Sequence, residues 1–180
     1  MKKVLKIVGI LILLVIVFVL VAAIFLPKTV HLEREVSINA SPEKIWPLVS
    51  NFRNHTKWSP FIKKDPDVIL TYEGADATVG SVYAWKGNRE VGSGRQTLTK
   101  LVEPRRVESH LNFIEPFEGE AEAFMILTPA GAVTKTVWGF DSKYPYPMNA
   151  MLMFVDIDGM LGKDYSDGLS KLKQLAESQP

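Results

Sequence analysis

The sequence predicts an α+β fold in which a curved antiparallel sheet of about seven strands wraps around one long C-terminal helix, preceded by a single transmembrane helix. Three observations predict it. An uncharged apolar run lies near the start of the chain, short segments of alternating apolar and polar residues fill its middle, and apolar residues at helical spacing occupy its end.

The N-terminal apolar run has the length of a membrane span. Ile7–Leu26 holds 20 residues without a charge, and at ~1.5 Å per residue it covers roughly 30 Å, the thickness of a bilayer's hydrocarbon core. We therefore expect a transmembrane anchor over residues 1–27 and one folded domain over residues 28–180.

A cleaved signal peptide is the alternative interpretation of this run. The apolar region of a signal peptide is usually only ~7–15 residues long and ends at a small-x-small site. Here Ala22-Ala23 are followed by Ile-Phe-Leu-Pro, which is a poor cleavage site. The uncleaved anchor is the preferred interpretation.

The distribution of lysine and arginine predicts the topology. Lys2, Lys3 and Lys6 precede the run, whereas Lys28 and Arg34 follow it. The positive-inside rule then places the N-terminus in the cytoplasm and the domain on the extracytoplasmic side of the membrane. Only a few residues join the run to the first expected strand, so we expect the domain to lie close to the lipid surface.

Composition excludes some classes of partner. Beyond the three N-terminal lysines, the 18 remaining basic residues are offset by 20 acidic ones, so the net charge does not support an electrostatic footprint for nucleic acid. The chain has no cysteine, so neither a disulfide nor a lipidated cysteine is possible. A weakly charged domain beside a membrane suggests a neutral or apolar partner. The oligomeric state stays open.

The middle of the chain predicts a strand, two short helices and six further strands. Residues 30–40 alternate as a half-buried strand does. Ser41 and Pro42 are typical of a helix start, and Pro47 limits the helix that follows, so we expect a second short helix after a corner. The further strands are expected near residues 68–72, 80–86, 94–102, 105–114, 120–128 and 132–141.

The end of the chain predicts a long helix. Its apolar face is spaced by four and three residues and consists of Leu161, Tyr165, Gly168, Leu172 and Leu175. A glycine on that face leaves room beside the helix.

Several segments together resemble the SRPBCC superfamily, and within it the polyketide cyclase/dehydrase and lipid-transport group. The segments are SINASPEKIWPLVSNFRNHTKWSPF, YEGADATVGSVYAWKGN, VGSGRQTLTKLVEPRRVESHLNF, TKTVWGFDSKYPYP and DIDGMLGKDYSDGLSKLKQLAES. The likeness runs from about Val30 to Glu177. It implies the helix-grip, START-like fold, in which the C-terminal helix closes an apolar cavity. The membrane anchor is an addition to the family pattern.

The resemblance implies a module that binds a lipid or another hydrophobic small molecule. Two alternatives stay open: a cyclase- or dehydrase-type enzyme acting on a hydrophobic substrate, and a protein-interaction module with a filled core. Strand parity, the helix pair and the helix face select the expected cavity residues, with the helix pair at the cavity rim. They are Trp58, Phe61, Tyr83, Trp85, Gln96, Leu98, Leu111, Phe113, Thr136, Trp138, Leu161, Tyr165 and Gly168.

No pattern predicts catalytic residues, a metal site or a cofactor. The sequence has no readable nucleophile–base pair and no metal-ligand spacing. His31, His55 and His110 are interpreted as solvated side chains. Four methionines within residues 148–160 predict either a ligand portal or flap that touches the membrane, or a short helix that closes the cavity end.

Overall fold

The computed structural model describes residues 1–178, and these residues form two compact units. Unit 1 comprises residues 1–30 and 143–157, and unit 2 comprises residues 31–142 and 158–178. The units do not follow chain order, because a segment just before the C-terminal helix groups with the N-terminal helix.

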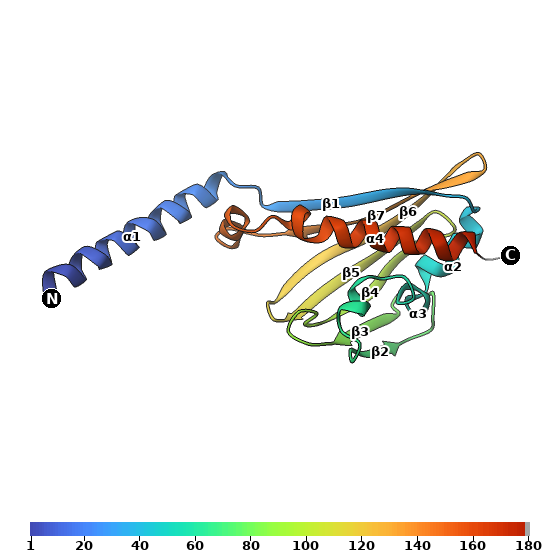
Figure 1. The fold of residues 1–180 in the computed structure, drawn as a ribbon, viewed down its shortest axis with the longest axis horizontal. Coiled ribbons are helices and arrows are strands. Elements are labelled where there is room, and N and C mark those ends of the chain that lie inside the picture. Colours follow the sequence, from blue (N-terminus) through green and yellow to red (C-terminus); the bar gives the residue numbers. More distant parts are fainter. Residues whose placement is uncertain (179–180) are drawn as a thin grey trace. The chain divides into compact units, whose positions relative to one another are not determined.

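Seven strands form one antiparallel sheet in the order β1-β7-β6-β5-β4-β3-β2, which can be followed in Figure 1. Each strand lies where residue alternation predicted one, so the predicted sheet is confirmed. The strands are β1 (Thr29–Ile38), β2 (Ile69–Glu73), β3 (Val82–Lys86), β4 (Ser93–Val102), β5 (Arg106–Glu115), β6 (Gly119–Ala130) and β7 (Val133–Lys143).

Two short helices follow β1, as predicted. α2 (Pro42–Ser50) begins with its proline, and α3 (Phe52–His55) follows after Asn51. Asn51 has extended backbone angles, and its Oδ1 accepts a hydrogen bond from the Arg53 amide at 2.8 Å. The extended backbone of Asn51 therefore ends α2, and its side chain caps α3. A 3-10 helix, η1 (Phe61–Lys64), comes before β2.

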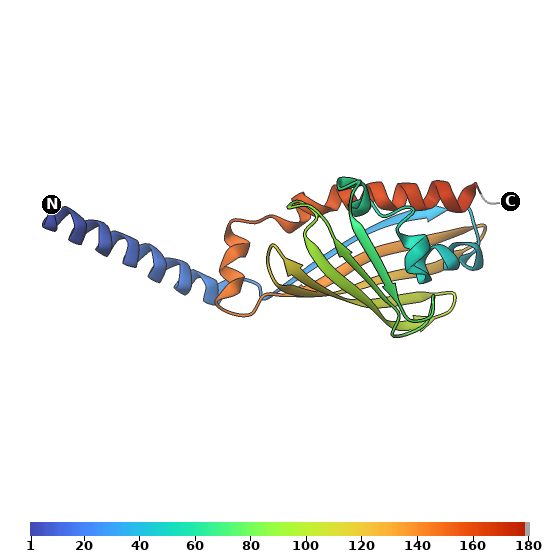
Figure 2. The same cartoon turned by 90° about the horizontal axis from the view of Figure 1, so that it is seen from below.

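The C-terminal helix α4 (Ile157–Glu177) lies along one face of the sheet (Figure 2). Its buried residues include Tyr165, Gly168 and Leu172, three of the five residues of the predicted face. β1 holds it near both ends. Arg34 donates from Nη2 to both carboxylate oxygens of Asp158, at 2.8 and 2.9 Å. The Glu177 carboxylate accepts from the backbone N–H of Asn39 at 2.7 Å.

Unit 1 contains α1 (Lys2–Phe25) and the 3-10 helix η2 (Met148–Met153). α1 is long and apolar enough to cross a membrane, with a mean hydropathy of 3.6 over its most apolar window. Ala23 is its only buried residue. Most of its other apolar side chains are exposed, which is typical of a helix that faces lipid.

Candidate functional site

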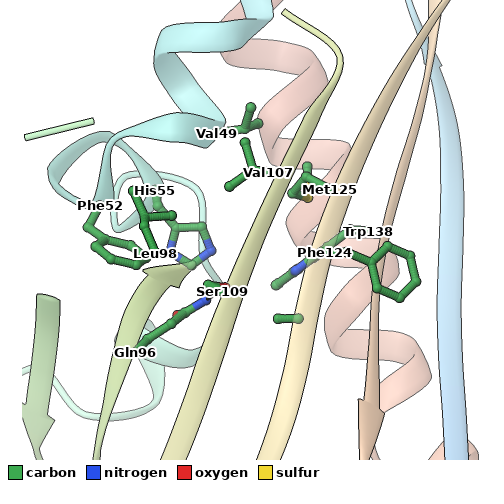
Figure 3. Close-up of a pocket in the computed structure, with 11 residues that line it drawn as sticks. Val49, Phe52, His55, Gln96, Leu98, Val107, Ser109, Phe124, Met125 and Trp138 are labelled. Atoms are coloured by element: carbon green, nitrogen blue, oxygen red, sulfur yellow. Dashed lines mark hydrogen bonds between the residues drawn. The ribbon is translucent and has the colours of Figure 1, made fainter. Parts of the chain in front are cut away.

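A small cavity lies inside unit 2, between the sheet and the α2–α3 segment (Figure 3). Its volume is about 20 Å³, which suffices for roughly one water molecule. Most of the lining is apolar. The lining residues are Val49, Phe52, His55, Gln96, Leu98, Val107, Ser109, Ala123, Phe124, Met125 and Trp138.

The register of strands β4 to β7 places the strand residues that line the cavity next to one another. Leu98 of β4 lies opposite Ser109 of β5, and Ser109 lies opposite Ala123 of β6. Farther along, Met125 of β6 lies opposite Trp138 of β7. Because alternate residues of a strand share a face, these side chains all point toward the helices.

The helix side of the cavity comes from the corner between α2 and α3. Val49 and Phe52 are buried and supply apolar surface. His55, the last residue of α3, projects its imidazole toward the strands that carry Gln96 and Ser109 (Figure 3). The imidazole packs edge-on against two indoles, with centroids 4.5 Å from Trp58 and 6.0 Å from Trp138.

Three polar side chains interrupt the apolar lining. Gln96 Nε2 donates to Ser109 Oγ at 2.7 Å, so these two satisfy each other. The Nδ1 atom of His55 is buried and has no hydrogen-bond partner within residues 1–178. Burial lowers the pKa of His55 to about 4, because a charged imidazole loses hydration there. At neutral pH the ring is therefore uncharged.

This arrangement suits binding better than proton transfer. A general base works best with a pKa near the operating pH, and that of His55 is far below neutrality. Burial raises the pKa of Tyr83 and of Tyr165, so both phenols keep their protons. Within residues 1–178, no cluster of three or more histidines, aspartates and glutamates is placed to hold a metal ion.

Three of the residues predicted to form the cavity line it: Gln96, Leu98 and Trp138. Trp58 was predicted at an open rim, but it is only 1% exposed, and its Nε1 donates to the Leu48 carbonyl at 2.8 Å. That indole is a core side chain. Phe61 is half-buried, with its ring 6.2 Å from the ring of Trp138.

The α4 residues of the predicted set pack tightly. Tyr165 stacks on Trp138 with centroids 4.0 Å apart. A Cβ at Gly168 would lie 2.7 Å from Cζ3 of Trp138 and 3.0 Å from Cδ of Pro60. The room that this glycine leaves is therefore filled by protein. Leu161 is half-buried at the start of the helix.

Another group of predicted residues forms a separate aromatic row toward β2. Tyr83 stacks on Trp85 at 5.6 Å, and Trp85 meets Phe113 edge-on at 6.0 Å. Two other predicted residues lie outside this row. Leu111 is half-buried opposite Gln96 in the register, and Thr136 is fully buried, with its Oγ1 atom unpartnered among the described residues.

Sequence reasoning missed His55. We expected all three histidines to be solvated, and this is wrong for His55, whose ring packs between indoles and lines the cavity. The segment FRNHTK around it is polar, so local pattern gave no sign of burial. The nearby Trp58 could have indicated that His55 is buried, because residues close in sequence to a buried tryptophan often pack against it. His31 and His110 are more open and pair with Asp141 and Glu122 at 2.7 Å.

Solved structures share this architecture. A putative uncharacterized protein from Rhizobium leguminosarum has a TM-score of 0.62 at 11% identity, covering 84% of this chain and 97% of that one. The Aha1 dimer from Colwellia psychrerythraea has a TM-score of 0.57 at 20% identity, with coverages of 83% and 97%. Protein CV1439 from Chromobacterium violaceum has a TM-score of 0.58 at 16% identity, with coverages of 85% and 99%. At these identities the likeness shows the fold alone.

The sequence itself establishes the family. No curated protein matches the chain. The profile of the family described as polyketide cyclase / dehydrase and lipid transport matches residues 29–177, which is nearly all of the chain after the apolar helix. With the helix-grip architecture and this match, the chain belongs to the polyketide cyclase/dehydrase and lipid-transport family of the SRPBCC superfamily.

Proposed function

We propose that the protein is a membrane-anchored binding module that holds a lipid or another hydrophobic small molecule inside unit 2. The observation that carries the proposal is the apolar cavity with the unpartnered Nδ1 of His55 on its wall. A buried polar atom without a hydrogen-bond partner costs about 1–3 kcal/mol. A ligand with an apolar body and one hydroxyl, which can donate or accept, would occupy the cavity and give this atom a partner.

Such a ligand requires the cavity to open. A volume of about 20 Å³ is far below the ~300–1,000 Å³ of typical small-molecule sites. Met125 and Leu98 supply flexible lining. Next to them lies an aromatic cluster of Trp58, Trp138 and Tyr165, which joins the helix corner to α4. We expect the ligand to enter by separating the rings of this cluster.

Native mass spectrometry of the full chain, extracted from its own membrane, tests the proposal. The wild-type chain should carry a co-purifying apolar molecule. Ala123→Leu places three additional carbons in the cavity and should remove that molecule. Ala84→Leu makes the same change on the opposite face of the sheet and should retain it. A bound molecule that persists in both variants would place its site elsewhere.

The anchor and its topology are also part of the proposal. α1 is supported as a span by its length, its hydropathy and its exposed apolar surface. The lysine bias favours a cytoplasmic N-terminus, with unit 2 on the extracytoplasmic side. The intact mass of the extracted chain distinguishes an uncleaved anchor from a cleaved signal peptide. A C-terminal reporter that functions only in the cytoplasm should be inactive, and its activity would reverse the topology.

The cavity volume favours one second candidate, a protein-interaction module with a filled core. The cavity has room for about one water molecule, and a well-packed core without a ligand commonly contains a space of this size. The same mass spectra decide between the two. Repeatedly empty protein in complex with a stable partner chain would favour the interaction module over ligand binding.

A further inference from the structure

The segment between β7 and α4 exposes an unusual set of apolar side chains in unit 1. Phe154 is 75% exposed and Met148 61% exposed. We call residues 146–154 the apolar segment; its exposed apolar side chains are Tyr146, Met148, Met151, Met153 and Phe154. A gathering of large apolar side chains at a surface marks an interaction site.

Asn149 ties the apolar segment to the C-terminal end of α1. This amide is fully buried, and its Nδ2 atom donates to the carbonyl of Ala23 at 2.6 Å, with longer contacts to Leu26 at 3.3 Å and Pro27 at 3.5 Å. The last carbonyls of a helix lack partners within the helix, so this amide supplies one. Figure 2 shows η2, in orange, beside the end of the blue helix α1.

A second hydrogen bond joins the residues just before the apolar segment to the residues just after α1. The Tyr144 amide donates to the Lys28 carbonyl at 2.8 Å. Asn149 and Tyr144 therefore hold the start of the apolar segment next to the residues where α1 ends, Ala23 to Lys28.

With α1 spanning the bilayer as proposed, that end of α1 would lie at the edge of the hydrocarbon layer. The uncharged run that ends at Leu26 spans roughly 30 Å, as the hydrocarbon core does. Aromatic rings concentrate at this depth, and short apolar helices lie in its plane. Lys28 and Lys143 flank the segment and are exposed, which suits contact with lipid phosphates.

We propose that the apolar segment lies in the headgroup–acyl boundary of the bilayer that α1 crosses, as a second membrane contact beside the anchor. The inference rests on the proposed anchor. A lipid surface would then contact the exposed aromatic rings and thioethers of the apolar segment. Asn149 would hold these side chains at the depth of the headgroup–acyl boundary.

The absence of cysteine from the chain makes the test direct. Met148→Cys and Phe154→Cys are each labelled with an environment-sensitive fluorophore in the full chain, reconstituted in phosphatidylcholine vesicles. Quenching by shallow and deep spin-labelled lipids and by aqueous iodide is then measured. Val15→Cys in the middle of α1 and Thr128→Cys on the surface of unit 2 are the controls. We expect shallow lipid quenchers to act several-fold more strongly at positions 148 and 154 than at 128, with iodide acting more weakly.

The controls separate the two proposals. One result would overturn the inference and leave the anchor in place. In that result, deep spin-labelled lipids quench the label at position 15 strongly, while iodide quenches the labels at positions 148 and 154 as much as the label at 128. No lipid quenching at 15 would overturn both. Positions 148 and 154 shielded from lipid and iodide alike would mean that protein covers the segment, which also overturns the inference.

A further variant tests the role of Asn149. Asn149→Ala in the Phe154→Cys chain should weaken the shallow-lipid quenching and increase the iodide quenching. Asn54→Ala removes an amide that donates to the Pro47 carbonyl of unit 2 at 2.9 Å and should change neither. Equal quenching in all three chains would show that Asn149 does not set the depth of the segment.

Discussion

The indole of Trp138 on β7 and the phenol of Tyr165 on α4 stack with their centroids 4.0 Å apart and their planes 24° from parallel. The two rings join the sheet to the helix in the middle of unit 2. Trp58 meets the same indole edge-on at 5.0 Å, so the helix corner after β1 joins this contact. Three parts of the chain that lie far apart in sequence therefore meet at Trp138.

Gly168→Ala should destabilise the protein, although alanine normally favours a helix by about 1 kcal/mol over glycine. The new Cβ would lie 2.7 Å from the Trp138 ring, and such overpacking costs about 1–3 kcal/mol. Thermal unfolding of the full chain should show a lower midpoint by several degrees. Ser170→Ala, at an exposed position of α4, is the control and should change little. A higher unfolding midpoint for Gly168→Ala would contradict this and show that the Trp138 ring moves aside at little cost.

His55 should make stability fall in acid. Its pKa is about 4 in the folded protein and 6.5 as the ordinary value, so between these pH values the unfolded chain binds a proton that the folded chain does not. The stabilisation is complete above pH 6.5 and is lost as the pH falls. From pH 7 to pH 5 we expect a loss on the order of 1–2 kcal/mol. In His55→Phe, which keeps a ring but cannot take up a proton, this loss should shrink.

His31 is the control for that experiment, because its pKa is shifted the other way. Its hydrogen bond to Asp141 raises the pKa, so its contribution is present below pH 6.5 and is lost as the pH rises through the folded value. His31→Gln should leave the acid loss in place. If His55→Phe loses as much stability between pH 7 and pH 5 as the wild-type chain, the loss comes from other titratable groups.

Gly162 and Arg34 should be energetically coupled. A Cβ at Gly162 would collide with the Arg34 guanidinium, which pairs with Asp158. In the wild-type chain, Gly162→Ala gains helix propensity but disturbs an ion pair worth roughly 0.2–1 kcal/mol. In the Arg34→Ala background, Gly162→Ala should stabilise by about 1 kcal/mol. Thermal midpoints of the four chains measure the coupling, and equal effects in both backgrounds would contradict it.

Gln96 and Ser109 should likewise show coupling in the cavity wall. Ser109→Ala leaves the Gln96 amide without its acceptor and should cost about 1 kcal/mol or more. Gln96→Leu with Ser109→Ala should cost less than the sum of the two single changes. Ser142→Ala, which removes a hydroxyl bonded to the Glu120 carbonyl instead, should combine additively with Gln96→Leu. Additivity in both cycles would mean that the amide finds another partner.

Most of the fold could be predicted from local pattern. Alternation located each strand to within two or three residues, and the spacing from Leu161 to Leu175 located α4, because both signals come from side chains facing one buried surface. Asn51 illustrates the limit of such patterns. The corner between the helices was expected from Pro47, but the helix break itself lies at Asn51, where an asparagine caps α3.

The site was harder to predict, because long-range packing decides it. The sequence predicts Trp58 at the cavity rim, whereas its indole donates to the Leu48 carbonyl and packs edge-on against Trp138. Gly168 left room in the sequence, but the Trp138 ring occupies it. Residues 143–157 group with the N-terminal helix through Asn149, a contact over more than a hundred residues that no periodicity encodes.

Photocrosslinking tests the central claim most directly. The full chain is placed in nanodiscs with a diazirine-bearing fatty acid, irradiated, and the adducts are located by peptide mass spectrometry. Binding inside unit 2 predicts adducts on cavity-lining residues such as Val49, Leu98 and Met125, and their loss in Ala123→Leu but not in Ala84→Leu. Adducts confined to α1 and the apolar segment, with none on the cavity lining, would contradict it.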